Sequence, residues 1–351
     1  MQKRLLEVDL IRGGTALAVI AIHVTAGYMD LGFGYLWNHL VRFAVPLFVL
    51  MSGLVLYWQD IDHKTLPASA FYAKRLQKVL IPYIIWTIIY TMVSQHILHL
   101  PLSTLSPVTL GRNLLWGTAY YHLYFIIIIL QMYLLYPLLT HWMRNQAPWL
   151  MPVSLLLSGG IQVLLYLNLI GSIFLPSQYS MLYLRAFPVW LFYFVFGMYA
   201  AEQLRKTGPF PSIFPRISYL ALCWLLALGL MLLDSRLTGI YVSIVRPSVI
   251  FYTLVSYHFF LTMARKMVDW KSTWTRWLSA QSFLIYLMHP LILTILTSSA
   301  RKLGCADMWS GSAGLIGLYL AVTAVTLLAA FIISRTPFAA ILGGMRAERV
   351  P

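Results

Sequence analysis

The chain has 351 residues, of which 60% are hydrophobic and only 10% are charged. A soluble domain is about one quarter charged, so this composition excludes a water-exposed globule and indicates helices that cross a bilayer several times. The formal net charge of +15 would suit nucleic acid, but it is equally expected of a membrane protein whose loops on one side are rich in Lys and Arg.

Ten apolar runs of roughly 16 to 21 residues are each long enough to cross a hydrocarbon core of about 30 Å. They lie at 10–29, 39–57, 79–96, 121–139, 149–168, 186–201, 217–233, 246–264, 279–298 and 313–333. No small-residue cleavage site follows the first run, which predicts a retained helix and not a signal peptide. Residues 99–113 are rich in Pro, Ser and Thr and predict an external loop.

The Lys and Arg residues orient this predicted all-α fold. Ten spans put both termini on the same side of the membrane. Of the 25 Lys and Arg residues, 18 fall on the side of the termini and 7 on the other side. Because cytoplasmic loops carry the excess of these residues, both termini are predicted to be cytoplasmic. The same bias accounts for the net charge, so we expect no nucleic-acid partner.

The first span, in the segment VDLIRGGTALAVIAIHVTAGY (8–28), contains three ionisable side chains. Arg12 and His23 are about 16 Å apart along a helix and about 20° apart around its axis, so they share a face. Asp9 can pair with Arg12 across one turn. Arg12 is expected at the inner boundary and His23 near the bilayer midplane, where ionisable residues indicate function. An imidazole suits proton abstraction from a hydroxyl; the alternatives are a packing histidine and an ordinary boundary arginine.

Two further segments contain candidates toward the inner side. In FYAKRLQKVLIPY (71–83), Arg75 and Lys78 share a helix face and can hold phosphates, although this pattern alone favours a plain basic loop. In PLFVLMSGLVLYW (46–58), Ser52 and Gly53 are small residues within a helix. Such residues usually allow close helix packing, which we favour here over the approach of a linear ligand.

Two segments contain further histidines. In YYHLYFIIIILQMYLLYPLL (120–139), His122 stands at the external entry of a span and Tyr133 lies deeper. His122 is either an interfacial anchor or a contact for an external substrate. In SFLIYLMHPLI (282–292), His289 precedes Pro290, which frees a backbone carbonyl in the helix. His289 is a second candidate base, although a structural kink is favoured. The sequence has no metal-ligand spacing and no P-loop.

Together these segments resemble the acyltransferase 3 family of bacterial integral-membrane acyltransferases. The resemblance runs from the N-terminus to about residue 335 and predicts a single transmembrane domain over 1–351, with its core at 5–335 and no appended soluble domain. Lys78 departs from the family pattern, which more often has arginine there. The matching positions are Arg12 and His23 of the R-x10-H signature, Ser52, Gly53, Arg75, Lys78, Pro82, His122, Tyr133, Pro137, Tyr286, His289 and Pro290.

The resemblance implies an enzyme of the bacterial cytoplasmic membrane. It would move an acyl group, often acetyl, from cytoplasmic acyl-CoA to a hydroxyl of an extracytoplasmic glycan or lipid-linked sugar, without a metal ion. Membrane lipid and glycan-biosynthesis proteins are the other expected partners. The implied roles are catalysis by His23, either as a base or as a brief carrier of the acyl group, with Asp9 orienting Arg12. Donor binding falls to Arg12, Arg75, Lys78 and Ser52, and substrate contacts to His122, Tyr133 and His289.

An exporter or flippase of a polysaccharide or lipid-linked glycan is the alternative function. Ten spans, intramembrane histidines and a basic inner mouth would suit it equally. A transporter is expected to show repeat symmetry and interrupted helices at matched positions. Neither pattern is visible in the sequence.

Overall fold

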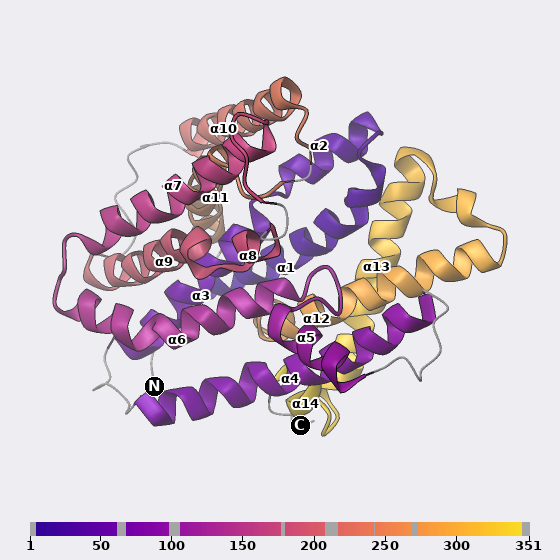
Figure 1. Cartoon of the computed structure of the whole chain (residues 1–351), viewed down its shortest axis with the longest axis horizontal. Coiled ribbons are helices and arrows are strands. Elements are labelled where there is room, and N and C mark those ends of the chain that lie inside the picture. Colours follow the sequence, from indigo (N-terminus) through magenta and orange to yellow (C-terminus); the bar gives the residue numbers. More distant parts are fainter. Residues whose placement is uncertain are drawn as a thin grey trace.

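The computed structural model describes residues 5–61, 68–97, 106–176, 180–207, 217–241, 243–267 and 273–345. Over these ranges the chain is built of helices, without a β-strand (Figure 1). The elements in chain order are α1 (Leu6–Thr25), η1 (Ala26–Tyr28), α2 (Gly32–Leu40), α3 (Ala44–Asp60), α4 (Ala68–Ile97), α5 (Pro107–Trp116), α6 (Tyr124–Arg144), α7 (Leu150–Leu169), α8 (Ser180–Arg185), α9 (Phe187–Thr207), α10 (Ile217–Thr238), α11 (Pro247–Lys266), α12 (Thr273–Lys302), η4 (Ala306–Trp309), α13 (Gly311–Ser334) and α14 (Ala339–Gly343).

The prediction of an all-α fold with ten spans is confirmed. Ten helical segments in the described ranges are long and apolar enough to cross a membrane, and each overlaps one predicted span. Part of the connection predicted as an external loop over 99–113 is helical, because α5 begins at Pro107, while residues 99–105 lie outside the described residues. Ser106 Oγ accepts a hydrogen bond from the Thr109 backbone N–H at 3.0 Å, and Pro107 takes the first helical position, a strong start signal for a helix.

The spans differ in how far the protein itself buries them. In the span that contains α3, 78% of the apolar window is buried, against 22% in those of α7, α10 and α13. Leucines on α10, among them Leu222, Leu226 and Leu230, are more than half exposed. A helix that exposes leucine along its length is expected to face lipid, so α3 lies at the centre and α7, α10 and α13 lie at the periphery.

Two glycines bring α3 and α9 together. A Cβ atom on Gly53 would collide with the backbone carbonyl of Phe194, and one on Gly197 would collide with the carbonyl of Leu50. Both obstacles are backbone atoms, which cannot move aside as a flexible side chain can. The packing interpretation of Gly53 is therefore confirmed, and Gly197 is its counterpart on the facing helix.

α1 and α12 lie parallel to each other and are in contact at three levels along their length. Ser279 Oγ donates to Asp9 Oδ1 at 2.6 Å, and Arg12 Nη2 donates to Ser282 Oγ at 3.2 Å. One level further on, the ring of His23 stacks on that of His289. The residue numbers of these contacts increase along both helices, so the two helices point the same way. This is expected for the first and ninth spans of a bundle whose spans alternate in direction. This pairing decides which α12 residues face His23.

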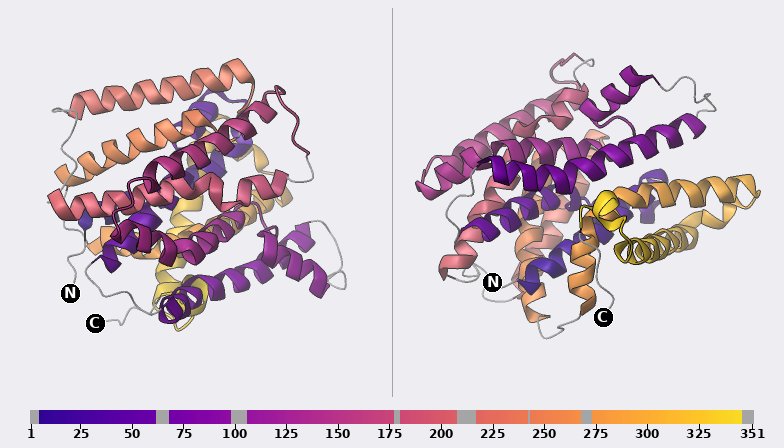
Figure 2. Two further views of the ribbon diagram at one scale, coloured as in Figure 1. Left: turned by 60° about the vertical axis from the view of Figure 1, so that its left-hand side comes forward. Right: turned by 90° about the horizontal axis from the view of Figure 1, so that it is seen from below.

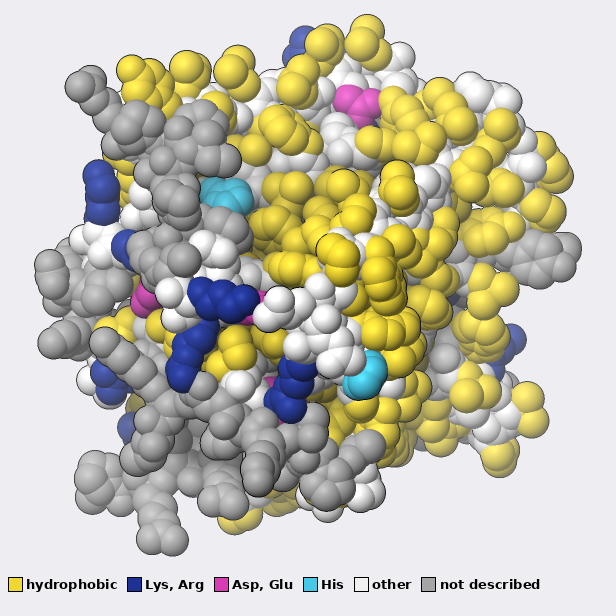
Figure 3. Space-filling model, turned by 90° about the vertical axis from the view of Figure 1, so that its left-hand side faces the viewer, with side chains coloured by type: hydrophobic (Ala, Val, Ile, Leu, Met, Phe, Trp, Pro, Cys, Tyr) yellow, Lys and Arg dark blue, Asp and Glu magenta, His cyan; other side chains and the backbone are white. Residues whose placement is uncertain are grey.

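The figures show how the remaining helices enclose this pair. α10, α11, α7 and α9 lie side by side in that order (Figure 2). α4 and α14 lie together at the lower edge of Figure 1, where Trp86 Nε1 donates to the Leu342 carbonyl at 2.9 Å. On the face in Figure 3 most Lys and Arg side chains gather toward one side, next to a broad apolar area. This separation of charge from apolar surface suits a protein that crosses a bilayer.

Candidate active site

His23 lies in the last turn of α1, two residues before the helix ends at Thr25. α1 begins at Leu6 and the candidate span closes at Tyr28, so His23 lies toward one end of this span, and its depth near the midplane stays a prediction. Six residues separate His23 from the middle of this span, which is about 9 Å along a helix. The half-buried imidazole lies between two rings, with centroid distances of 4.8 Å to Tyr121 and 5.2 Å to His289.

His122 is buried at the centre of a ring cluster. It lies in the turn that precedes α6, is only 1% exposed, and has ring-centroid distances of 5.2 Å to Tyr286 and 5.9 Å to His289. This burial excludes the interfacial-anchor interpretation. Neither ring nitrogen of His122 has a hydrogen-bond partner in the described part of the chain. A buried polar group without a partner is uncommon and marks a place where a ligand would be bound.

His289 is fully buried on α12, one residue before Pro290. Its Nδ1 lies 3.1 Å from the Ile285 carbonyl, which can only accept a hydrogen bond. Nδ1 is therefore the donor, and Nε2 is free to accept. Nε2 has no partner among the described residues. His289 therefore offers a free acceptor nitrogen, in addition to any structural role beside the distortion at Pro290.

The hydroxyl of Tyr90 on α4 interrupts the hydrogen-bond ladder of α12 next to His289. It donates to the Leu287 carbonyl at 2.7 Å and accepts from the Leu291 N–H at 3.1 Å, standing between a pair that an unbroken helix would join directly. Pro290 lacks an N–H and removes one further rung. α4 thus holds α12 in a distorted form at the level of the histidines.

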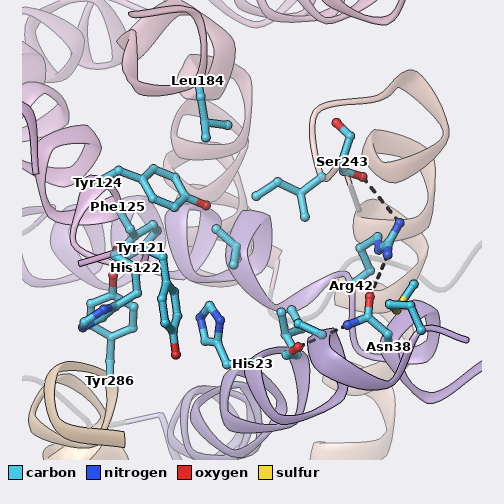
Figure 4. A pocket seen from close by; sticks show the side chains of 15 residues that line it. His23, Asn38, Arg42, Tyr121, His122, Tyr124, Phe125, Leu184, Ser243 and Tyr286 are labelled. Atoms are coloured by element: carbon cyan, nitrogen blue, oxygen red, sulfur yellow. Dashed lines mark hydrogen bonds between the residues drawn. The ribbon is translucent and has the colours of Figure 1, made fainter. Parts of the chain in front are cut away.

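A cavity of about 360 Å³ opens beside His23, near the C-terminal end of α1 (Figure 4). Its lining combines the ring cluster with polar residues of α2, its C-terminal turn and the loop before α11. The residues are Ile22, His23, Ala26, Met29, Asn38, Arg42, Val45, Tyr121, His122, Tyr124, Phe125, Leu184, Ser243, Ile244 and Tyr286. A neighbouring cavity of about 390 Å³, with Thr294, Thr297 and Arg301 in its lining, also reaches His23. We call the first of these the outer cavity, after the side on which the bias of Lys and Arg predicts it to lie.

A second cavity, which we call the inner cavity after its predicted side, opens toward the opposite end of α1 and has a volume of about 250 Å³. It brings together every residue for which donor binding was predicted. They are Arg12, Ser52, Arg75 and Lys78, with Tyr133 on the same lining. Arg75 Nη2 also donates to Gln59 Oε1 at 3.1 Å, and Ser52 Oγ donates to the Phe48 carbonyl at 2.8 Å. Gly343 and Gly344 complete the mouth, so the C-terminal segment lies at the same end as Arg12.

Phe125 and Tyr286 line both the outer and the inner cavity. They therefore form the wall between the two spaces. The Tyr286 hydroxyl donates to the backbone carbonyl of His122, which ties this wall to the histidine cluster. A molecule in either cavity can thus approach the same few side chains from its own end.

Asp9 is placed at the inner end, apart from the histidines. It is 4% exposed and accepts the short hydrogen bond from Ser279. A carboxylate on α1 fourteen residues before His23 lies about 21 Å from it along the axis. Asp9 therefore contributes to the seam between α1 and α12 and does not form a dyad with His23.

Several residues of the two cavities were missed by sequence reasoning. Asn38, Arg42, Tyr121 and Phe125 were not singled out as site residues, although Arg42 stands at the start of a predicted span. An arginine placed inside an apolar run was the one available signal for this part of the site. The others are ordinary polar or aromatic residues, and only the packing of distant helices reveals them.

The arrangement offers groups that can take up and release a proton beside the wall between the two cavities. His289 lies within ring-contact distance of both His23 and His122, and ring nitrogens of His122 and His289 have no hydrogen-bond partner among the described residues. In the described ranges no group of His, Cys, Asp and Glu could hold a metal ion. General acid–base chemistry is what these side chains offer.

Comparison with known proteins gives one match. A family model described as an acyltransferase domain, the third of that name, matches residues 5–335, which is nearly the whole chain. No curated protein and no solved structure matches the chain.

Proposed function

The chain belongs to this acyltransferase family, and from that premise we propose that it moves an acyl group, acetyl in the first instance, from cytoplasmic acyl-CoA to a hydroxyl of an extracytoplasmic glycan or lipid-linked sugar. The membrane would be the bacterial cytoplasmic membrane. One observation carries the proposal: two cavities at opposite ends share Phe125 and Tyr286 as their common wall. Such a layout suits a donor and an acceptor that come from different compartments.

The inner cavity suits the donor. Arg12, Arg75 and Lys78 give it three positive charges, which would bind the phosphates of CoA. Its volume of about 250 Å³ is below the roughly 300 to 1,000 Å³ of pockets that enclose a whole small ligand. We therefore propose that only the narrow pantetheine arm enters, past Ser52 and Tyr133, while the nucleotide stays at the mouth.

The acceptor hydroxyl would meet His23 from the outer cavity. In the proposed step His23 takes the hydroxyl proton, the hydroxyl oxygen attacks the thioester carbonyl carbon, and the carbon–sulfur bond breaks. The proton then passes from His23 to the departing CoA thiolate, which leaves as the free thiol. A positioned base of this kind contributes about 10²- to 10⁴-fold to a rate.

His122 and His289 would complete the site as substrate contacts. Their unused ring nitrogens lie next to the wall, where the thioester carbonyl and the attacking hydroxyl would meet. The ring N–H of His122 would be the donor toward the carbonyl oxygen, where negative charge develops in the transition state, and His289 Nε2 would accept from the attacking hydroxyl. Asp9 would act as a positioning residue for Arg12 through the α1–α12 seam.

Family membership supports a transferase over the exporter alternative. An exporter would need to pass its whole cargo between the two cavities, whereas a transferase needs only the acyl group to cross the Phe125–Tyr286 wall. Nothing in the described part of the chain favours passage of a glycan.

The experiment that tests the proposal uses the full-length protein in sealed vesicles with cell-envelope glycan as acceptor. Labelled acetyl-CoA is supplied on one face at a time. We expect label in the glycan when acetyl-CoA is on the face that carries the termini, and none when His23 is replaced by Ala. Binding of acetyl-CoA without any transfer of label, in vesicles where the protein is folded, would contradict the proposal.

A further inference from the structure

Two arginines lie buried together at the outer end of the molecule. Arg42, which follows α2, is 1% exposed, and Arg246, at the start of α11, is fully buried. Arg246 pairs with the Asp234 carboxylate at 3.4 Å and also donates to Ser235 Oγ at 2.9 Å. A buried guanidinium is stabilised by such a counter-ion, since an uncompensated buried charge is costly.

Arg42 has no such counter-ion within the described residues. It donates to the Asn38 side-chain oxygen at 2.6 Å, to the Tyr241 carbonyl, and to the Ser243 carbonyl at 3.5 Å. All three acceptors are neutral. A guanidinium has five N–H donors, so these three bonds leave part of the group unused.

The neighbouring histidine does not supply the missing charge. His39 Nδ1 lies 2.8 Å from the Tyr35 carbonyl and Nε2 lies 2.8 Å from Ser235 Oγ. A carbonyl can only accept, so Nδ1 carries the proton, and His39 is neutral or positive but never negative. The buried group of two guanidinium ions and one carboxylate therefore keeps one positive charge.

This positive charge faces the proposed site of reaction. Arg42 and His23 line the same outer cavity (Figure 4). Asn38, held by Arg42, donates in turn to the Ile22 carbonyl at 3.1 Å and to Thr25 Oγ1 at 2.9 Å. The Ile22 carbonyl belongs to the peptide bond that joins Ile22 to His23. Arg42 is thus linked through one side chain to the backbone that holds the catalytic candidate.

We propose that the acceptor carries an oxyanion, a phosphate or a carboxylate close to the hydroxyl that is acylated, and that Arg42 binds it. This inference rests on the proposed function and names the chemical class of its acceptor. The oxyanion would supply the counter-ion that Arg42 lacks, and its attachment to the guanidinium would hold the sugar hydroxyl toward His23. A neutral sugar would leave the buried charge uncompensated.

Binding to the purified full-length protein tests the proposal with three defined probes: N-acetylglucosamine 1-phosphate, glucuronic acid and N-acetylglucosamine. We expect the parent protein to bind at least one of the two anionic probes at least tenfold more tightly than the neutral one, and the stronger of the two identifies phosphate or carboxylate as the source of the oxyanion. Arg42→Gln should weaken the preferred anionic probe by roughly 10- to 100-fold and leave the neutral probe unchanged. The affinity of Arg42→Lys for the preferred anionic probe should lie between those of the parent and Arg42→Gln, because lysine keeps the charge but lacks the planar guanidinium.

Arg301→Gln is the matched control, because it removes one positive charge from the neighbouring cavity and leaves Arg42 intact. Equal affinity of the parent for charged and neutral probes, no measurable binding of either anionic probe, or full anion binding by Arg42→Gln would each overturn the inference. If Arg42→Gln does not fold, the parent and Arg42→Lys decide the outcome. Acetyl-CoA binding is measured in parallel: its presence with no anion preference refutes this inference alone, whereas its absence in the parent refutes the proposed function.

Discussion

The imidazole rings of His23 on α1 and His289 on α12 stack with their centroids 5.2 Å apart and their planes 29° from parallel. The two residues are separated by 266 positions in the sequence, and the pair is set by hydrogen bonds lower on the same helices, from Arg12 to Ser282 and from Ser279 to Asp9. Proton transfer at His23 would therefore take place next to a second imidazole, which can itself exchange a proton.

His23→Ala should reduce acyl transfer by about 10²- to 10⁴-fold, because the general base is lost. CoA binding at the inner cavity and thermal stability in detergent should stay near those of the parent. Transfer of labelled acetyl, CoA binding and a melting curve on the same preparation check this. A packing role would give the opposite order, with stability lost first and activity falling only in step with it.

His289 allows its ring packing and its nitrogen chemistry to be separated. His289→Phe keeps an aromatic ring against His23 but removes Nε2, whereas His289→Ala removes both. If Nε2 takes part in the reaction, both variants should lose turnover and only the Ala variant should also lose stability, by about 2 to 4 kcal/mol for a buried ring. Turnover retained in His289→Phe would show that the ring only packs.

Arg12→Ala and Arg75→Ala should each weaken CoA binding by about 1.5 to 3 kcal/mol, the usual value of a charge-assisted contact. Lys206→Ala provides the control, since Lys206 is a basic, exposed residue of α9 that pairs with Glu202 and lines none of the cavities described above. Equilibrium binding of CoA at two salt concentrations measures the effect. Parental affinity in both arginine variants would place the donor elsewhere.

Gly53→Ala and Gly197→Ala should destabilise the protein by about 1 to 3 kcal/mol each, since the added methyl meets backbone atoms of the facing helix. Gly229→Ala on α10 is the contrasting change, because nothing lies within 4 Å of its new methyl group. It should leave stability unchanged or raise it by up to about 1 kcal/mol through helix propensity. Unfolding in detergent followed by circular dichroism distinguishes the three variants.

Reporter fusions test the orientation that the bias of Lys and Arg predicts. Fusions at residues 110 and 305 should report the exterior, and a fusion at residue 351 the cytoplasm. A cytoplasmic signal at 110 would reverse the molecule and with it the side from which the donor comes.

Hydropathy was sufficient to predict the spans, because each depends only on a local run of apolar residues long enough to cross lipid. The shared face of Arg12 and His23 follows from helix geometry in the same way. The meeting of His122 with His289, and of Arg42 with the outer cavity, depends on contacts between helices far apart in the sequence, which no local pattern contains. The start of α1 at Leu6, before its apolar run, was also missed, and Ser279 of α12 donates a hydrogen bond to Asp9 near that end of the helix.

The wall formed by Phe125 and Tyr286 bears on the proton gradient across the membrane. A bacterial membrane stores work as a proton gradient, and an enzyme with reactants on both faces would drain that gradient if its two sites joined into a water-filled passage. Under the proposed function, the two aromatic rings between the sites would keep them separate while a thioester and a hydroxyl approach from either end. Under the proposed reaction, only the few atoms of the acyl group would pass from one compartment to the other. No pathway for protons or other ions would open across the membrane.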